Sequence, residues 1–107
     1  MPIQKILAAC VVGLSALAAH AADNDDAQKL YTQSLAATCA NCHGTEGRAL
    51  KDATVPGLSG LSAEVFIEQM KAFKSGERSA TIMHQISKGF NDRQIQQLAN
   101  YFASQKR

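Results

Sequence analysis

Residues 39–43 read Cys39-Ala40-Asn41-Cys42-His43, and the rest of the chain is organised around this stretch. The pattern Cys-x-x-Cys-His is the attachment signature of a c-type haem. Two thiols three positions apart on a turn can reach the two vinyl groups of one porphyrin and form thioethers. The histidine that follows the second thiol is then held under the iron, where its imidazole can bind. The sequence therefore predicts one covalent haem c, attached at Cys39 and Cys42, with His43 as an axial ligand.

Three other chemistries also use paired cysteines. A thioredoxin-like redox pair needs a βαβ context, and no strand pattern lies near residues 39–43. Without residues 1–21, two Cys and two His remain, which is numerically a tetrahedral zinc set, but His43 abuts Cys42 and His84 stands alone. A structural disulfide would leave the histidine unexplained. Haem attachment is therefore the prediction, and zinc and dithiol chemistry are its alternatives.

The start of the 107-residue chain has the features of a secretory signal peptide. Met1–Lys5 carries one positive charge, residues 6–19 are almost entirely apolar, and residues 19–21 read Ala-His-Ala, with small residues at the two positions that signal peptidase reads. The apolar run is too short and wrongly flanked for a membrane anchor. We predict a cleaved signal peptide over residues 1–21, a mature domain over residues 22–107 and a periplasmic location.

Cys10 suggests a second way to process the same segment. Leu7-Ala8-Ala9-Cys10 looks like a lipoprotein processing site, but the apolar run continues beyond Cys10. A lipidated Cys should end the hydrophobic region rather than lie near its start. Cleavage after Ala21 is therefore the expectation, with no membrane anchor.

Charge and size restrict the class of protein. The chain has 11 Lys and Arg against 9 Asp and Glu, and no basic block or stripe suggests a nucleic-acid partner. One small domain buries only a modest core. A large apolar cofactor, held covalently, would complete that core as metals or disulfides do in other small domains.

Hydrophobic spacing predicts an all-α domain. A first helix is expected over Asp23–Ala37, because acidic residues near its start suit the positive end of the helix dipole. A second helix should begin at the N-cap Ser62 and end at Gly76. A short helical piece is expected around residues 82–86. The last helix should follow Asn91, with Gln94 three residues on completing a capping box. The apolar faces are expected at Ala27, Leu30, Tyr31, Ser34 and Leu35 in the first helix, at Val65, Phe66, Met70 and Phe73 in the second, and at Ile95, Leu98, Ala99 and Phe102 in the last.

Residues 44–60 are expected to be irregular, because they contain four glycines and Pro56. A loop of this length in a small domain usually has a function or something to wrap. Wrapping one edge of a haem would be such a function.

Three side chains are candidates for the sixth position of the iron. Met70 lies on an apolar helical stripe, so we expect a core side chain there. Met83 lies about forty residues past His43, on a segment that can close over the far haem face. His84 is its rival, since imidazole binds iron well. Neighbours on a helix point about a third of a turn apart, so Met83 and His84 cannot both face the iron. Met83 is the predicted ligand, with His84 or an open site as alternatives.

Taken together, these residues resemble a class I cytochrome c, and the resemblance covers essentially all of residues 22–107. It implies a small fold of three to five helices wrapped around one covalent haem. It also implies that the carbonyl of Pro56 holds the other ring nitrogen of His43, and that Met83 is the distal ligand. In this family the first and last helices cross, often through a small residue and an aromatic four apart. Ala27 with Tyr31, or Tyr31 with Leu35, are the candidates here.

A finer resemblance lies in three stretches: Phe73-Lys74-Ser75-Gly76-Glu77-Arg78, Thr81-Ile82-Met83 and Ile86-Ser87-Lys88-Gly89-Phe90. They are similar to the cytochrome subunit of flavocytochrome c sulfide dehydrogenase, and so is the ending Tyr101-Phe102-Ala103. That resemblance implies a flavoprotein partner that oxidises sulfide. Cytochromes c4, c5 and c553 share much of the pattern, which leaves a freely diffusing carrier as the alternative. Either way the expected function is one-electron transfer rather than catalysis, and a haem sensor with an open iron is a third hypothesis.

Overall fold

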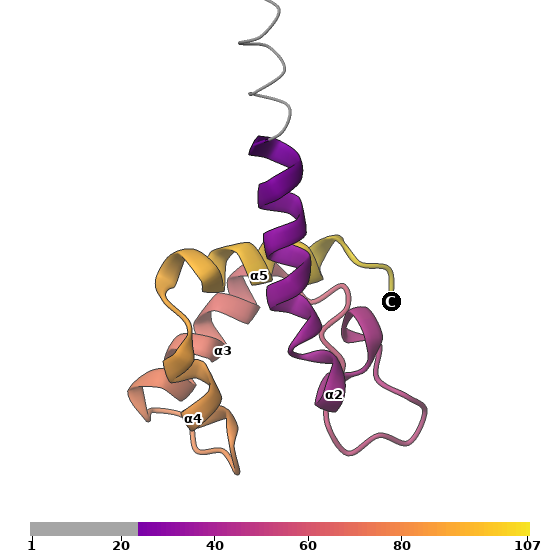
Figure 1. Cartoon of the computed structure of the whole chain (residues 1–107). Coiled ribbons are helices and arrows are strands. Elements are labelled where there is room, and N and C mark those ends of the chain that lie inside the picture. Colours follow the sequence, from indigo (N-terminus) through magenta and orange to yellow (C-terminus); the bar gives the residue numbers. More distant parts are fainter. Residues whose placement is uncertain (1–23) are drawn as a thin grey trace, which may run out of the picture. The chain divides into compact units, whose positions relative to one another are not determined.

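The computed structural model describes residues 24–107, and Figure 1 follows their chain. The predicted signal peptide and Cys10 lie outside these residues. The chain divides into two units, Met1–Tyr31 and Thr32–Arg107. In the first unit the described residues 24–31 are helical, and the helix runs on to residue 37, as expected. The site lies in the second unit.

Thr32–Arg107 is built from helices and loops. After the helix that ends at residue 37 come α2 (Ala40–His43), η1 (Thr45–Gly47), α3 (Ala63–Ser75), α4 (Met83–Ile86), η2 (Ser87–Gly89) and α5 (Asp92–Ser104). Residues 24–107 contain no strand, so the all-α prediction is confirmed. No helix within these residues is long and apolar enough to cross a membrane.

The two long helices begin and end where their capping residues predict. The Ser62 side chain accepts a hydrogen bond from the Val65 backbone N–H at 3.3 Å, and Gly76 ends α3 in the left-handed conformation with φ 85°. At the start of α5, Asn91 and Gln94 each accept from the other's backbone N–H, which completes the capping box. Such caps satisfy backbone groups that a helix end leaves unpaired.

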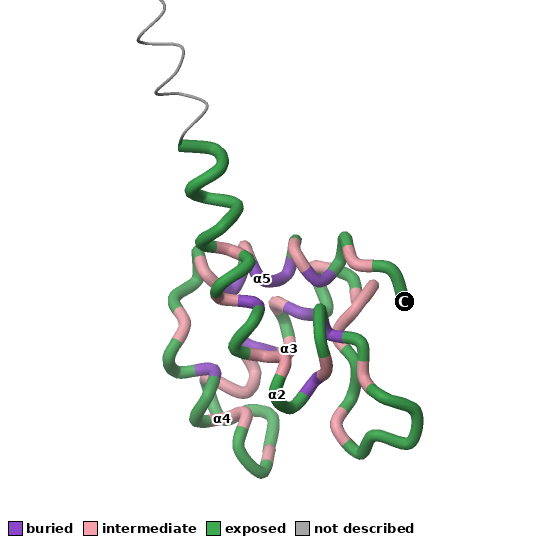
Figure 2. The backbone as a smooth tube through the Cα atoms, turned by 45° about the vertical axis from the view of Figure 1, so that its right-hand side comes forward, coloured by how far each residue is buried: buried purple, intermediate pink, exposed green. Residues whose placement is uncertain are grey.

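The core lies where α3 packs against α5. In Figure 2 the buried stretches of the second unit gather on these two helices, whereas the loop between η1 and α3 is mostly exposed. Phe102 is fully buried and stacks on Phe66 with ring centroids 5.6 Å apart. Such aromatic pairs contribute about 0.5–1.5 kcal/mol beyond the area they bury. The buried apolar residues are Ala36, Phe66, Met70, Ile95, Leu98, Ala99 and Phe102.

The predicted apolar face of the first helix is confirmed at Leu35 and wrong at Leu30 and Tyr31. Leu30 and Tyr31 are 64% and 43% exposed, whereas Ala36 belongs to the buried cluster and Leu35 packs against it. Spacing indicates which positions share one face of a helix, but it does not show how much of that face is buried.

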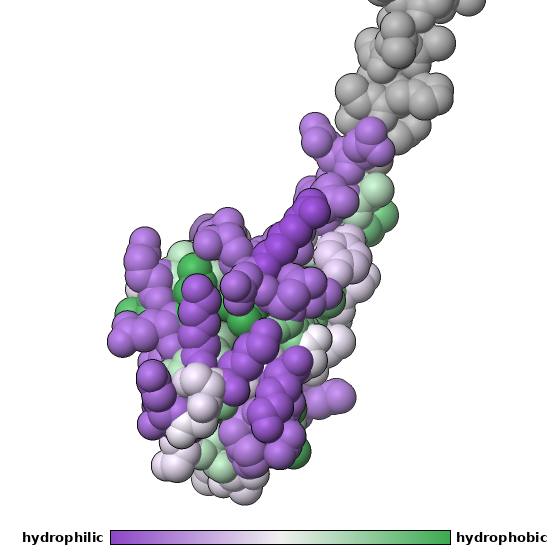
Figure 3. All heavy atoms as spheres, turned by 90° about the vertical axis from the view of Figure 1, so that its left-hand side faces the viewer, coloured by the Kyte–Doolittle hydropathy of each residue, from purple (hydrophilic) through white to green (hydrophobic). Residues whose placement is uncertain are grey.

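Smaller differences concern the loop segments. Residues 44–60 were predicted to be irregular throughout, but Thr45–Gly47 forms one 3₁₀ turn. The short helical piece is Met83–Ile86, continued by the 3₁₀ turn Ser87–Gly89. Hydrophilic side chains cover most of the face drawn in Figure 3, with smaller apolar areas between them.

Candidate functional site

The attachment motif forms one tight helical turn. Cys39 is the N-cap of α2, and its carbonyl accepts hydrogen bonds from the backbone N–H groups of Cys42 at 3.4 Å and His43 at 2.9 Å. Residues three apart in such a turn lie on the same side of it. Both thiols are free; that of Cys39 is half-buried and that of Cys42 is exposed. The turn therefore presents two thiols on one side and an imidazole at its end.

Gly44 ends this turn in a conformation that requires glycine. Its φ is 86°, and an added Cβ would lie 1.9 Å from the carbonyl oxygen of Arg48. Side chains larger than hydrogen are therefore excluded both by the backbone angle and by contact with another backbone segment. The glycine lets the chain reverse immediately after His43, so that the following loop returns past the histidine.

The loop brings the carbonyl of Pro56 to the imidazole of His43. His43 Nδ1 lies 2.6 Å from the Pro56 oxygen, and the histidine is 9% exposed. A carbonyl oxygen can only accept, so the proton of the ring lies on Nδ1 and Nε2 keeps its lone pair. Metal-binding histidines usually donate their second ring N–H in this way, which fixes the ring and raises the basicity of the ligating nitrogen.

Burial changes the acidity of the first thiol. It raises the pKa of Cys39, and a hydrogen bond with the Thr38 side chain lowers the pKa by a smaller amount. A dithiol redox site needs a thiolate stabilised at low pKa. The shift at Cys39 has the opposite sign, which argues against the thioredoxin-like alternative.

The zinc alternative lacks a ligand set. Within residues 24–107 no group of three or more His, Cys, Asp or Glu side chains is placed to hold a metal ion. His84 therefore does not complete a tetrahedral site with the residues of the motif.

The candidate distal residues differ in burial. Met70 is 6% exposed and belongs to the buried cluster, as its place on the apolar stripe indicates. Met83, the first residue of α4, is half-buried and packs against that cluster. His84 is also half-buried, and its Nδ1 is buried without a hydrogen-bond partner. Because Met70 is part of the core, it is a poor candidate for the distal ligand. Met83 and His84 on α4 remain the candidates.

The donor set fits a covalent haem. Two free thiols on one turn suit two thioethers, and an imidazole fixed through Nδ1 suits axial ligation through Nε2. Among known proteins, the family described as cytochrome c matches residues 24–106. The chain belongs to the cytochrome c family. Its cofactor is one covalent haem c, and its chemistry is electron transfer rather than the transformation of a bound substrate.

This cytochrome is similar to several curated proteins, two of which have names that refer to a dehydrogenase of a sulfur compound. It is 34% identical over 70 residues to the cytochrome subunit of sulfide dehydrogenase from Chlorobaculum tepidum, covering 65% of this chain and 62% of that protein. It is 35% identical over 97 residues to the thiosulfate dehydrogenase electron acceptor of Stutzerimonas stutzeri, covering 87% of this chain and 44% of that protein. Cytochrome c-554(548) of Halomonas halodenitrificans is 36% identical over 72 residues, 64% of this chain and 86% of its own. The first two relatives are thus matched over only part of their length.

Sequence reasoning did not identify the contacts that hold the Pro56 loop of this cytochrome in place. The Gly47 carbonyl accepts hydrogen bonds from the backbone N–H groups of Leu58 at 2.7 Å and Ser59 at 3.1 Å. A Cβ on Gly47 would lie 2.8 Å from the Phe102 ring. The glycines themselves were the available signal, but which segments they allow to approach is visible only in three dimensions.

Proposed function

We propose that this cytochrome is a periplasmic one-electron carrier that accepts electrons from a flavoprotein sulfide dehydrogenase. The observation that supports the site most directly is the His43–Pro56 hydrogen bond beside two free thiols. The observation that supports the partner is the similarity to a sulfide dehydrogenase cytochrome subunit. A thiosulfate dehydrogenase electron acceptor is also similar, and both names refer to a dehydrogenase of a sulfur compound.

In this proposal Cys39 and Cys42 provide the two thioether sulfurs. His43 provides Nε2 to the iron, and Pro56 holds its Nδ1 proton. Bound haem supplies a one-electron couple at its iron. The residues of the chain tune the reduction potential of that couple, because a hydrogen-bonded imidazole is a stronger donor and stabilises the ferric state.

Met83 is proposed as the sixth ligand. It begins α4, a short helix that packs against α3, and its half-buried side chain already contacts the apolar cluster. A thioether ligand raises the potential relative to a second imidazole. A filled sixth position also excludes small molecules from the iron, which favours outer-sphere electron transfer over ligand sensing.

Carbon monoxide distinguishes electron transfer from sensing. A purified ferrous protein with Met83 and His43 on the iron should show little spectral response to carbon monoxide. A rapid and complete response would indicate an open site and would favour the sensor hypothesis.

The partner would approach the edge of the attachment turn. Asn41 and Cys42 are exposed and Ala40 is half-buried, so this edge carries small or neutral side chains. Burying neutral groups against a partner avoids the cost of removing charges from water. Close approach at this edge would shorten the path for an electron from the flavin.

The decisive experiment isolates the cytochrome from its host together with any bound protein. We expect a flavoprotein to co-purify, and we expect sulfide to reduce the cytochrome faster in the presence of that flavoprotein. Ala40→Glu should slow this reduction and leave the absorption spectrum unchanged. Ala103→Glu is the matched control, since it places the same charge at an exposed position of α5.

If no flavoprotein binds and sulfide reduction is no faster with host extract, a freely diffusing carrier replaces this proposal. Similarity to cytochrome c-554(548) and to a cytochrome c4 from Pseudomonas aeruginosa supports that second candidate.

A further inference from the structure

We propose that Arg48 is a positioning residue for His43, acting through the segment that follows α5. The inference rests on the proposed role of His43 as the proximal ligand. It concerns the loop of residues 48–56, which ends in the carbonyl that holds the imidazole. The cytochrome c motif itself does not include Arg48, residue 106 or residue 107.

The two ends of this loop lie side by side. At its beginning, the Arg48 N–H donates to the Thr45 carbonyl at 3.0 Å. At its end, Leu58 and Ser59 donate to the carbonyl of Gly47. The ten residues between Gly47 and Leu58 therefore form a closed loop that includes Pro56. Any movement between its two ends changes where the Pro56 carbonyl lies relative to His43.

The segment after α5 contacts the start of the loop and the turn that follows the loop. Arg48 Nε donates to the Lys106 carbonyl at 3.2 Å, and Arg107 Nη2 donates to the Gly60 carbonyl at 3.3 Å. Arg107 also lies over Gly60, because a Cβ there would be 2.7 Å from its Cγ. One short segment thus joins the residue that starts the loop to the turn that follows it.

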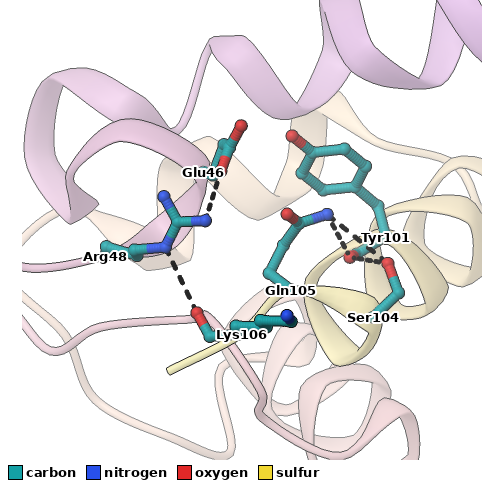
Figure 4. A network of polar contacts seen from close by, with 6 residues as sticks. All are labelled: Glu46, Arg48, Tyr101, Ser104, Gln105 and Lys106. Carbon is teal, nitrogen blue, oxygen red and sulfur yellow. Dashed lines mark hydrogen bonds and ion pairs between the residues drawn. The ribbon is translucent and has the colours of Figure 1, made fainter.

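Arg48 is held in the orientation that this contact requires. Figure 4 shows its guanidinium between Glu46 and the Lys106 carbonyl, with Nη2 2.6 Å from the Glu46 carboxylate. The segment is anchored in turn on α5, since Gln105 Nε2 donates to the Tyr101 carbonyl at 3.1 Å. The Gly60 N–H donates to the Phe102 carbonyl at 2.8 Å. The contacts therefore run from the core helix to the start of the loop and to the turn that follows it.

The Glu46–Arg48 ion pair is half-exposed, and such pairs contribute little to global stability. Its contribution is instead geometric. A hydrogen bond from Nδ1 to a carbonyl raises the basicity of the ligating nitrogen only while donor and acceptor stay aligned. Releasing Arg48 should let the loop move, weaken this hydrogen bond and make His43 a poorer donor. The reduction potential should then rise.

Removing the charge of Arg48 should by itself change the reduction potential in the opposite direction. Taking a positive charge away from the neighbourhood of the iron disfavours the added electron and lowers the potential. Lys51 lies in the same loop and is exposed. Lys51→Met is therefore the matched control for Arg48→Met, because both replace a long cation by an apolar side chain.

The test measures two quantities on the full, haem-loaded protein: the midpoint potential and the NMR exchange rate of the His43 Nδ1 proton in the ferrous state. Arg48→Met should raise the potential and increase the exchange rate severalfold. Arg107→Met should shift both in the same direction, and Arg48→Lys should restore both toward wild type. Lys51→Met should leave the exchange rate unchanged and should not raise the potential.

Equal exchange rates and potentials in Arg48→Met and Lys51→Met would overturn the proposal, even if Arg48→Met melts at a lower temperature. If Arg48→Met does not accumulate, Arg107→Met decides by the same criteria. A wild-type spectrum in which His43 does not bind the iron would overturn both this proposal and the proposed proximal ligand. A wild type ligated by His43 that lacks a sulfide-oxidising partner would overturn only the partner assignment.

Discussion

Gly60 donates its backbone N–H to the carbonyl of Phe102 at 2.8 Å, so the loop that precedes α3 is hydrogen-bonded to the last turns of α5. The Phe102 ring is fully buried against Phe66, and its edge approaches Gly47. The most deeply buried aromatic side chain of the described residues therefore belongs both to the core and to the support of the candidate haem site. Substitutions in and around this site should show which residues are needed for haem attachment, which for haem ligation and which for folding.

The distal ligand is tested by Met83→Leu. We expect covalent haem to be retained, the sulfur-to-iron absorption band to be lost and the potential to fall, because the thioether no longer stabilises the ferrous state. Met70→Leu is the control, since a near volume-conserving core swap costs less than about 1.5 kcal/mol. Loss of the band in Met70→Leu alone would mean that the two methionines have been assigned in reverse. Absence of the band from the wild type, together with a changed haem spectrum in His84→Gln alone, would identify the imidazole.

Covalent attachment is tested at the two thiols. Haem should remain with the wild-type chain on a denaturing gel and should be lost from Cys39→Ala combined with Cys42→Ala. That double variant should also fold poorly, because the cofactor completes a small core. Haem staining and circular dichroism measure the two effects. A stable, well-folded double variant would contradict the assignment of the site.

The turn after the motif is tested by Gly44→Ala. The left-handed φ of 86° alone costs about 1–3 kcal/mol for a side chain, and the new Cβ would collide with the Arg48 carbonyl. We expect poor accumulation of holoprotein and a lowered melting temperature. Gly89→Ala is the matched control, because nothing lies within 4 Å of a Cβ there. Similar melting temperatures for the two variants would show that the turn tolerates a side chain.

Export is tested by the mass of the mature protein. The apolar run and residues 19–21 predict cleavage after Ala21, so the chain recovered from the periplasm should begin at Ala22. Mass spectrometry of the intact holoprotein provides the measurement. A retained Met1, or a lipid on Cys10, would contradict this prediction.

Local signals in the sequence predicted the limits of the long helices well. Ser62, Gly76 and Asn91 act within a few residues of themselves, so their effect can be recognised without knowing the fold. The buried face of α5 was also predicted, because a strongly amphipathic helix has one obvious apolar side. The motif at Cys39–His43 was equally clear, since attachment depends on spacing alone.

Contacts between distant residues could not be predicted in the same way. Arg48 and Lys106 are 58 positions apart, and neither residue type indicates the other. The buried Ala36 was missed because it lies off the helical face that the spacing of the other apolar residues of the first helix indicated. The hydrogen bond from His43 to Pro56 was expected only through the family resemblance, since the two residues lie thirteen positions apart.

The hydrogen bond between Gly60 and Phe102 also has a kinetic consequence. A chain is synthesised from its N-terminus, so residues 39–43 are available well before Phe102 exists. Until α5 docks, nothing fixes Gly60, and the closure of a contact this distant in sequence is slow compared with local helix formation. We therefore expect a period, before this hydrogen bond forms, in which both thiols are accessible. An enzyme that attaches the cofactor could act in that interval, before α5 docks and the hydrogen bonds that hold the loop beside His43 are complete.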